Sequence, residues 1–249
     1  MADPLRLYGL KALVINAASG IGEASARTLV KHGASVLAAD TINSGVEQHF
    51  KSVKGIDGYS TNLLDSTRMP GLVEEAVKRL GGIDILIIDF PLQADGPLID
   101  GNDKLKDLLE IRSALLLSVC RAAMPHLEKS PAGRIVNIGL LRSVFATNGE
   151  QAFAKSEQDL AALTTDLALE IGEVGITVNY VQPGAIMTPA SRDAFRKNME
   201  LRDYCIANSA ARRLGEPVDV AKVVLFLASD DAAFVNGTGV NVDGGRSNR

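Results

Sequence analysis

The residues best placed for chemistry form a short run of small side chains near the start of the chain. Residues 17–22 read Ala-Ala-Ser-Gly-Ile-Gly, between an apolar segment at Lys11–Asn16 and an amphipathic one that begins at Gly20. Small side chains let the backbone approach an anion, and the free N–H groups of a helix start favour negative charge. A turn of this kind between a strand and a helix predicts a site for the pyrophosphate of a dinucleotide. A tight turn without a ligand is the alternative.

An acidic residue follows at the spacing expected for such a site. Asp40 ends the next apolar segment, Ser35–Ala39, about 20 residues after the turn. A carboxylate there accepts hydrogen bonds from the adenosine ribose and repels a 2′-phosphate, which predicts NAD rather than NADP as the cofactor. The alternative is that Asp40 caps the following helix.

The elements that must position these residues alternate along the chain. Short runs that are apolar on both faces are separated by longer amphipathic stretches. This pattern predicts a doubly wound α/β fold, a Rossmann fold with a parallel sheet covered by helices on both faces. We expect a single domain over residues 1–249, with the ligand beyond the carboxyl ends of the strands.

The pattern also gives approximate bounds for each element. The predicted strands are Lys11–Asn16, Ser35–Ala39, Gly58–Ser60, Ile83–Asp89, Arg134–Gly139, Ile176–Val181 and Gly239–Val242. The predicted helices are Gly20–His32, Thr41–Lys51, Asp65–Leu80, Leu108–Glu128, Glu150–Val174 and Val218–Ala228. Gly33 and Asp65 are expected helix caps. The segment from about 187 to 212 has the weakest strand pattern and is expected to form a lid over the site.

Composition and charge narrow the class of protein. Apolar residues make up 46% of the 249 residues and the net charge is −4, so nothing favours nucleic acid or an anionic membrane. No apolar run approaches the roughly 18 residues that span a bilayer, and the first residues lack a secretory signal pattern. Cys120 and Cys205 are expected to be reduced thiols, and no His/Cys cluster has metal-ligand spacing. These features predict a cytoplasmic protein without a metal.

Taken together, the motifs resemble the short-chain dehydrogenase/reductase family along nearly the whole chain. Besides the turn and Asp40, the matching runs are Gly133–Ile138, Val178–Asn179, Pro183–Gly184, Arg213–Pro217, Asp219–Ala221, Gly237–Gly239 and Asp243–Gly245. The resemblance implies NAD(P)-dependent oxidation or reduction of alcohol and carbonyl substrates. It also implies a homo-oligomer, a tetramer or dimer, assembled through the two long helices and through the last strand and helix.

The four positions that carry out hydride transfer in that family hold other residues in this chain. The family uses an asparagine that holds a water, a serine that orients the substrate oxygen, a tyrosine acid/base, and a lysine that lowers the tyrosine pKa. The matching positions are Arg112, Leu140, Phe153 and Glu157. Phenylalanine has no proton to transfer, and leucine cannot polarise a carbonyl. Lys155 is a poor substitute for the lysine, because it points about 200° away from Phe153 around the helix.

Two of these replacements predict a compensating pair. A glutamate stands for the lysine, and an arginine stands for the asparagine that faces it. We hypothesise that Arg112 and Glu157 form an ion pair between the two long helices, which avoids the cost of two isolated buried charges. The alternative is that both side chains reach solvent separately.

The resemblance also marks the residues expected to bind the cofactor. These are Asn16, Ser19, Gly20, Ile21, Gly22, Asp40, Asn62, Leu63, Pro183, Gly184, Ile186 and Thr188. Asn16 replaces a family glycine, and asparagine tolerates unusual backbone angles less well than glycine. Asn62 replaces an aspartate that contacts adenine. Ile88-Asp89-Phe90-Pro91 replaces Asn-Asn-Ala-Gly, so Phe90 and Pro91 bring bulk beside the ribose. We therefore expect a weakened NAD site.

Three functions remain open at this point. The leading one is a pseudoenzyme, a family member that binds a nucleotide or another small molecule without hydride transfer. The alternatives are an ordinary NAD-dependent oxidoreductase, and a lyase, isomerase or hydratase that uses the same pocket without redox chemistry. Arg142, Ser143, Glu150 and Tyr204 are candidate acids and bases for that last alternative, or else solvated surface residues. Tyr180 is expected in the core.

Overall fold

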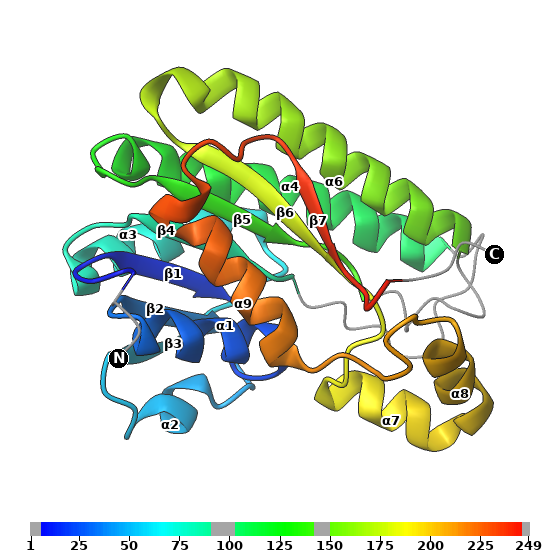
Figure 1. Cartoon of the computed structure of the whole chain (residues 1–249). Helices are drawn as coiled ribbons and strands as arrows, with labels where there is room; N and C mark the ends of the chain where they lie inside the picture. The colour runs from blue at the N-terminus through cyan, green and yellow to red at the C-terminus, as the bar shows by residue number, and fades with distance from the viewer. Residues whose placement is uncertain (1–5, 91–102, 142–149, 246–249) are drawn as a thin grey trace.

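Seven parallel strands form one sheet with helices on both faces (Figure 1). The computed structural model describes residues 6–90, 103–141 and 150–245. The strand order is β3-β2-β1-β4-β5-β6-β7. The strands are β1 Lys11–Ile15, β2 Ser35–Asp40, β3 Ile56–Ser60, β4 Ile85–Ile88, β5 Arg134–Ile138, β6 Thr177–Pro183 and β7 Gly239–Val242.

Helices connect the strands along the chain. They are α1 Gly20–Lys31, α2 Val46–Phe50, α3 Met69–Leu80, α4 Asp103–Leu127, α6 Glu150–Ile171, α7 Pro189–Lys197, α8 Met199–Ala207 and α9 Pro217–Ala228. Three short 3₁₀ turns add Ser66–Arg68, Gly172–Val174 and Asp230–Ala232. The predicted doubly wound α/β fold is confirmed.

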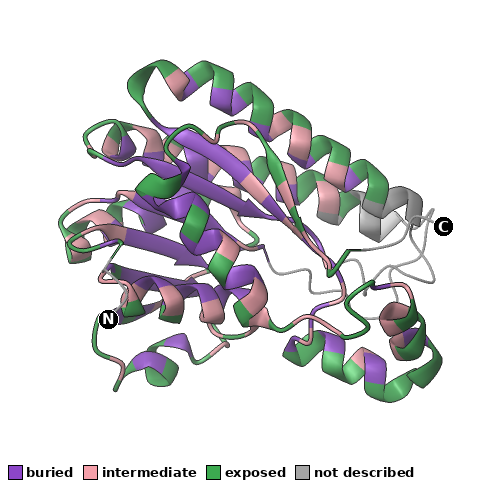
Figure 2. Cartoon of the chain, in the orientation of Figure 1, coloured by how far each residue is buried: buried purple, intermediate pink, exposed green. Residues whose placement is uncertain are grey.

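The sheet is apolar on both faces because successive side chains of a strand point to opposite sides. In β1, Leu13 and Ile15 join the core cluster that includes α3, α4 and α6. Ala12 and Val14 join the cluster that includes α1, α2 and α9. Figure 2 shows the resulting layer of buried strands between the two sets of helices.

The register of the sheet brings three connections to one edge. Ile15 at the end of β1 pairs with Ala39 of β2 and with Ile88 of β4. Asn16 and Asp89, which follow β1 and β4, and Asp40, the last residue of β2, therefore lie side by side. This edge is the carboxyl end of the parallel sheet, where a ligand is expected in such folds.

Three helix predictions needed correction at their starts, and the helix predicted from Leu108 already begins at Asp103. The helix predicted over Thr41–Lys51 is confined to Val46–Phe50, because Gly45 adopts a left-handed conformation with φ 71° just before it. The helix predicted over Asp65–Leu80 begins as a 3₁₀ turn, and Asp65 caps that turn by accepting a hydrogen bond from the Thr67 N–H.

The predicted lid segment, 187–212, contains the helices α7 and α8, which lie beyond the end of β6 (Figure 1). Its base is closed by backbone pairing, since the Met187 N–H donates to the Gly215 carbonyl at 2.8 Å. The Ala210 and Ala211 N–H groups donate to the carbonyls of Gly245 and Gly244, both at 2.9 Å. The segment is therefore fixed at both ends and attached to the chain that follows β7.

Two glycines offer a matched test of the packing between β3 and α2. A Cβ on Gly58 would lie 2.6 Å from the Glu47 Cα, whereas one on Gly71, in α3, would meet nothing within 4 Å. We expect Gly58→Ala to lower the free energy of unfolding by about 1–3 kcal/mol through overpacking. Gly71→Ala should leave it unchanged or raise it by up to about 1 kcal/mol through helix propensity. Urea unfolding monitored by circular dichroism measures both, and equal midpoints would contradict the close packing.

Candidate functional site

The turn after β1 is tight and is anchored to β2. Asn16 adopts a left-handed conformation with φ 61°, which asparagine tolerates better than most residues other than glycine. The Ala17 N–H donates to the Ala39 carbonyl at 3.1 Å, and the Ala18 N–H donates to Asp40 Oδ2 at 2.7 Å. A Cβ on Gly22 would overlap the Asn16 carbonyl oxygen. Only glycine therefore allows the helix to start this close to the strand.

Asp40 has a structural role that the sequence did not predict. Its side chain is buried, and its Oδ1 accepts hydrogen bonds from the Thr41 N–H at 2.6 Å and the Thr41 hydroxyl at 3.2 Å. Since Oδ2 holds the Ala18 N–H, the carboxylate ties the turn to the end of β2. It does not cap α2, which begins at Val46.

The start of α1 fits an anionic group. Ser19 precedes the helix in an extended conformation and makes no side-chain capping hydrogen bond. N–H groups of the first turn are therefore not capped by that side chain, and the helix dipole favours negative charge beside them. Gly20, with φ 63°, faces Thr188, whose Cγ2 would lie 3.5 Å from a Cβ built on the glycine. The start of α7 thus closes over the turn.

The other predicted cofactor residues divide into three groups. Asn62 uses its Oδ1 to accept from the Leu64 N–H at 3.1 Å. Ile21, Leu63 and Ile186 are buried core side chains, so only their backbone would face a ligand. Pro183 ends β6, and a Cβ on the next residue, Gly184, would lie 2.7 Å from the Asp243 Cα. The last two positions therefore pack toward the residues that follow β7.

Of the two residues predicted to bring bulk beside the ribose, the structure describes only Phe90. Phe90 is 7% exposed and belongs to the core cluster that includes α3 and α4, so its ring packs inward. The core thus accommodates the size of this ring. Pro91 lies outside the described residues.

Arg112 lies at the family asparagine position on α4 and is buried. One guanidinium nitrogen donates to the Ser156 hydroxyl at 2.6 Å and another to the Ile138 carbonyl at 3.0 Å. The predicted direct ion pair with Glu157 does not form; the guanidinium hydrogen bonds go to Ser156 and Ile138 instead. The two charges still interact: burial lowers the pKa of Arg112, whereas Glu157 and Asp89 both oppose that shift.

Glu157 lies at the family lysine position on α6. Its Oε1 accepts from the Leu140 N–H at 3.3 Å, and its buried Oε2 has no hydrogen-bond partner within the described ranges. Burial raises the pKa of Glu157 to about 7, against the opposing charge of Arg112. Gln182 lies on the same side of Gly139 as Glu157, since a Cβ built on Gly139 would meet Oε2 of the glutamate and Oε1 of the glutamine, and the buried Gln182 Oε1 also lacks a partner among the described residues. This part of the fold thus holds a carboxyl group that is readily protonated at neutral pH.

Asp89 is a site residue that the sequence analysis named only as a departure from the family. Burial raises its pKa to about 7, opposed by hydrogen bonds from the Asn16 side chain and the Gly22 N–H and by the charge of Arg112. It therefore joins the turn to the buried arginine. The sequence feature that could have identified Asp89 is an acidic residue directly after β4, at the same end of the sheet where Asp40 ends β2.

Four of the predicted residues lie wholly or in part outside the described part of the chain. Phe153 and Glu150 lie in α6, but their side chains are outside the described part of the chain, as are Arg142 and Ser143 entirely. The prediction that Lys155 points away from the pocket is confirmed, because its exposed Nζ pairs with Asp159 at 3.2 Å.

The two tyrosines differ in exposure. Tyr180 packs against the core as expected but is only partly buried, and burial and the charge of Glu157 raise its pKa. Tyr204, on α8, is half exposed.

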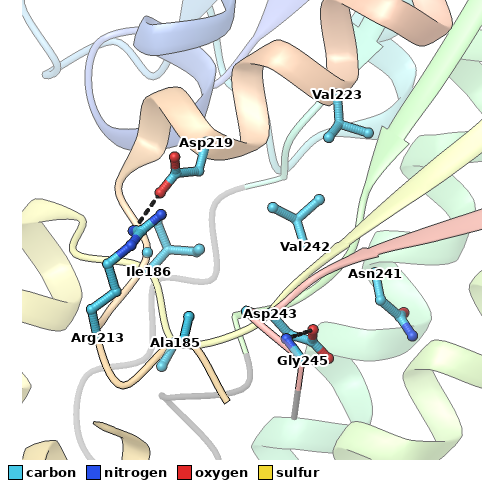
Figure 3. Close-up of a pocket in the computed structure, with 12 residues that line it drawn as sticks. Ala185, Ile186, Arg213, Asp219, Val223, Asn241, Val242, Asp243 and Gly245 are labelled. Carbon is cyan, nitrogen blue, oxygen red and sulfur yellow. Dashed lines mark hydrogen bonds and ion pairs between the residues drawn. The ribbon is translucent and has the colours of Figure 1, made fainter. Parts of the chain in front are cut away.

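A cavity of about 330 Å³ lies beside the connection from β6 to α7 and was not predicted (Figure 3). Arg213 and Asp219 in its wall form an ion pair at 2.7 Å, and Val223 and Val242 add apolar surface. Neither the turn at Asn16–Gly22 nor Glu157 lines this cavity. It shares Ile186 with the predicted cofactor residues, but it lies apart from the turn and from Glu157.

Two further findings bear on the kind of site. Within residues 6–90, 103–141 and 150–245, no three or more His, Cys, Asp or Glu side chains gather as metal ligands would. No helix in those same ranges is long and apolar enough to cross a bilayer.

Comparison with known proteins places this geometry among oxidoreductases. A family model described as Enoyl-(Acyl carrier protein) reductase matches residues 16–247. The chain is 30% identical over 246 residues to 3-oxoacyl-[acyl-carrier-protein] reductase FabG of Thermotoga maritima, which covers 97% of this chain and 99% of the relative. It is 32% identical over 251 residues to oxidoreductase UcpA of Escherichia coli K12, covering 96% and 95% of the two chains.

Solved structures show the same fold. A putative gluconate dehydrogenase from Agrobacterium tumefaciens superposes with a TM-score of 0.82 at 26% identity, over 96% of each chain. Levodione reductase superposes with a TM-score of 0.84 at 22% identity, over 96% of this chain and 98% of that one, and this likeness concerns the fold alone.

The raised pKa of Glu157 predicts a pH-dependent stability. A carboxyl group with a pKa of about 7 in the folded chain stabilises the fold below its ordinary pKa near 4, and this contribution is lost as the pH rises through 7. Glu157→Gln keeps an acceptor for the Leu140 N–H without the charge. We expect this variant to be more stable than the wild type by about 1–3 kcal/mol at pH 8 and equally stable at pH 4.5. Urea unfolding at the two pH values measures this, and equal stability at pH 8 would contradict a buried, ionising Glu157.

Proposed function

Because this chain belongs to the short-chain dehydrogenase/reductase family, we propose that it keeps a dinucleotide site for NAD(H) but does not transfer hydride by the family's tyrosine–lysine mechanism. In this proposal it is a pseudoenzyme that acts through a bound nucleotide or small molecule.

The observation that carries the proposal is the engagement of Glu157 at the lysine position. Its Oε1 holds the Leu140 N–H, and its pKa is raised to about 7. A carboxyl group there cannot lower the pKa of a neighbouring phenol, and Phe153 is not a phenol. Arg112 uses its donors on Ser156 and Ile138. These residues stabilise one another in place of a proton relay.

The residues of the cofactor half support binding. The uncapped start of α1 offers N–H groups to a pyrophosphate, and Thr188 lies over Gly20 beside it. The charge of Asp40 disfavours a 2′-phosphate, which is the basis for proposing NAD(H) over NADP(H). NAD(H), when bound, supplies the hydride chemistry of the family, and Leu140 and Phe153 supply no proton to accompany it.

Two alternatives each have a specific observation behind them. The relatives at 30–32% identity are named as reductases and as an oxidoreductase, which favours hydride transfer by an unrecognised donor. The pKa of Glu157, about 7, favours a non-redox acid/base reaction instead, since the best catalytic pKa lies near the working pH.

Nucleotide binding without turnover is the expected result. NADH should raise its fluorescence on titration with the protein, NADPH should bind at least about tenfold more weakly because of Asp40, and neither should be oxidised by a broad set of carbonyl compounds. The measurements are a fluorescence titration and an absorbance assay at 340 nm, with heat-killed protein as the control.

Each other outcome selects a different function. Turnover well above the heat-killed control, unchanged in Phe153→Leu, would show an unrecognised proton donor and reject the pseudoenzyme. Absence of binding by both nucleotides would reject the dinucleotide site.

We also propose a homo-oligomer, a tetramer or a dimer. Large apolar side chains are exposed on the elements expected to pair: Leu169 of α6 is 76% exposed, and Phe226 of α9 is 37% exposed. Strand β7 is an edge of the sheet and is only partly covered. Light scattering should give a mass of two or four chains, and Leu169→Glu should shift it to smaller species. A mass of 26.3 kDa, one chain, for the wild type would contradict the proposal.

A further inference from the structure

We propose that Glu157 carries a proton on Oε2 and donates it to Gln182 Oε1, so that Gln182 is the positioning residue for this carboxyl group. A proton held between these two side chains is not available to a ligand, which argues against a non-redox acid/base reaction at Glu157. The inference goes beyond the proposed function, because it concerns the chain alone and does not depend on nucleotide binding.

The backbone of Leu140 fixes one end of each side chain. The Leu140 N–H donates to Glu157 Oε1 at 3.3 Å, and Gln182 Nε2 donates to the Leu140 carbonyl at 3.0 Å. Only the nitrogen of a side-chain amide can donate to a carbonyl, so this second bond determines which end of Gln182 faces Leu140. The atoms that remain are Glu157 Oε2 and Gln182 Oε1, and both are acceptors while the carboxyl group is ionised.

These two oxygens converge over Gly139. A Cβ built on Gly139 would overlap Gln182 Oε1 and would lie 3.0 Å from Glu157 Oε2. Both oxygens are buried, and neither has a hydrogen-bond partner among the described residues. Burying an acceptor without a donor is costly, and two such acceptors at one point repel each other. A proton on Oε2 satisfies both oxygens with a single hydrogen bond.

No other side chain in the described ranges donates to either oxygen. The guanidinium of Arg112 makes its hydrogen bonds to two other acceptors. Tyr180 lies on the same face of β6 as the glutamine, but a Cβ built on Gly239 would overlap its hydroxyl, so that hydroxyl lies over β7. Lys155, on the helix of the glutamate, pairs with an aspartate at the surface. The proton of the carboxyl group itself is therefore the donor that completes the arrangement.

The charges that face Glu157 allow this neutral form. Arg112 on α4 and the Leu140 N–H favour the ionised form, but burial outweighs them and raises the pKa of Glu157 to about 7. Asp89 acts on it only through the same guanidinium. Tyr180 on β6 is neutral at this pH, because burial and the charge of Glu157 raise its pKa. The protonation state that the geometry requires is thus populated at neutral pH and below it.

The test is a titration of the whole chain from pH 5 to pH 9, followed by NMR of the side-chain carboxyl and amide carbons. Only Glu and Gln are labelled with carbon-13, so Asp89 gives no signal. We expect the Glu157 signal to titrate with a midpoint near 7, and the Gln182 signal to move with the same midpoint because it accepts that proton. The Gln158 signal is the internal control and should not move, since this neighbour of Glu157 on α6 is exposed.

Two variants separate the shared proton from general burial. Glu157→Gln identifies the Glu157 signal and should abolish the titration of Gln182, because its amide donates to Gln182 Oε1 at every pH. Gln182→Asn withdraws the acceptor by one methylene and keeps an amide, so the Glu157 acid dissociation constant should rise by about tenfold, one pKa unit. Gln158→Asn makes the same change at an exposed position of α6 and should leave the Glu157 midpoint unchanged.

The opposite results overturn the proposal. A Glu157 midpoint near the ordinary value of about 4 would show an ionised carboxylate, satisfied by a water or a cation instead of a proton. A Gln182 signal that stays fixed in the wild type, or a Glu157 midpoint that is unchanged or raised in Gln182→Asn, would show that Gln182 does not accept the proton. If Gln182→Asn does not fold, the wild type and Glu157→Gln still decide the question, and a loss of the nucleotide site would affect none of these results.

Discussion

The centre of this fold depends on one buried positive charge. The guanidinium of Arg112 is fixed by the Ser156 hydroxyl and the Ile138 carbonyl, and two carboxyl groups, Asp89 and Glu157, interact with it electrostatically. A buried charge without compensation is costly, and removing one partner of such a group leaves that cost on the others. The strand end at Ile138 and the two long helices are therefore held in one arrangement.

The charge of Arg112 acts in the same direction on the pKa of both Asp89 and Glu157. Both are buried, and burial raises the pKa of each to about 7 despite the arginine. Neither forms a direct ion pair with Arg112, so the attraction offsets only part of the desolvation. Sharing one cation, they tie the phosphate-binding turn to the pocket where the family would place its proton relay.

The sequence predicted the architecture well because its signals are local. Apolar runs and caps mark strands and helices, and the glycine turn and Asp40 appear in the order that the fold requires. The exposed position of Lys155 followed from helical periodicity alone, and asparagine is among the few residues that tolerate the left-handed conformation of Asn16. Such features depend on neighbours in the chain.

The features that the sequence could not predict depend on contacts between distant segments. The ion pair inferred for Arg112 and Glu157 does not form; the guanidinium hydrogen-bonds to Ser156 and to the Ile138 carbonyl, and neither acceptor carries a sequence signal. Phe90 was expected beside the ribose and packs into the core, since only the course of the chain after β4 decides between them. The sequence analysis noted Asp89 only as a departure from the family pattern. Its meeting with Asn16 and Gly22 follows from the register that aligns the ends of β1 and β4.

Under the proposed function, the charges at the family's catalytic positions are arranged so that they compensate one another. Glu157, at the position matched to the family lysine, would be an uncompensated buried carboxylate unless a cation lay nearby. Arg112 supplies that cation from the asparagine position, and its hydrogen bonds to Ser156 and Ile138 hold it in place. Since Asp89 interacts with the same cation, one guanidinium offsets part of the burial cost of both carboxyl groups.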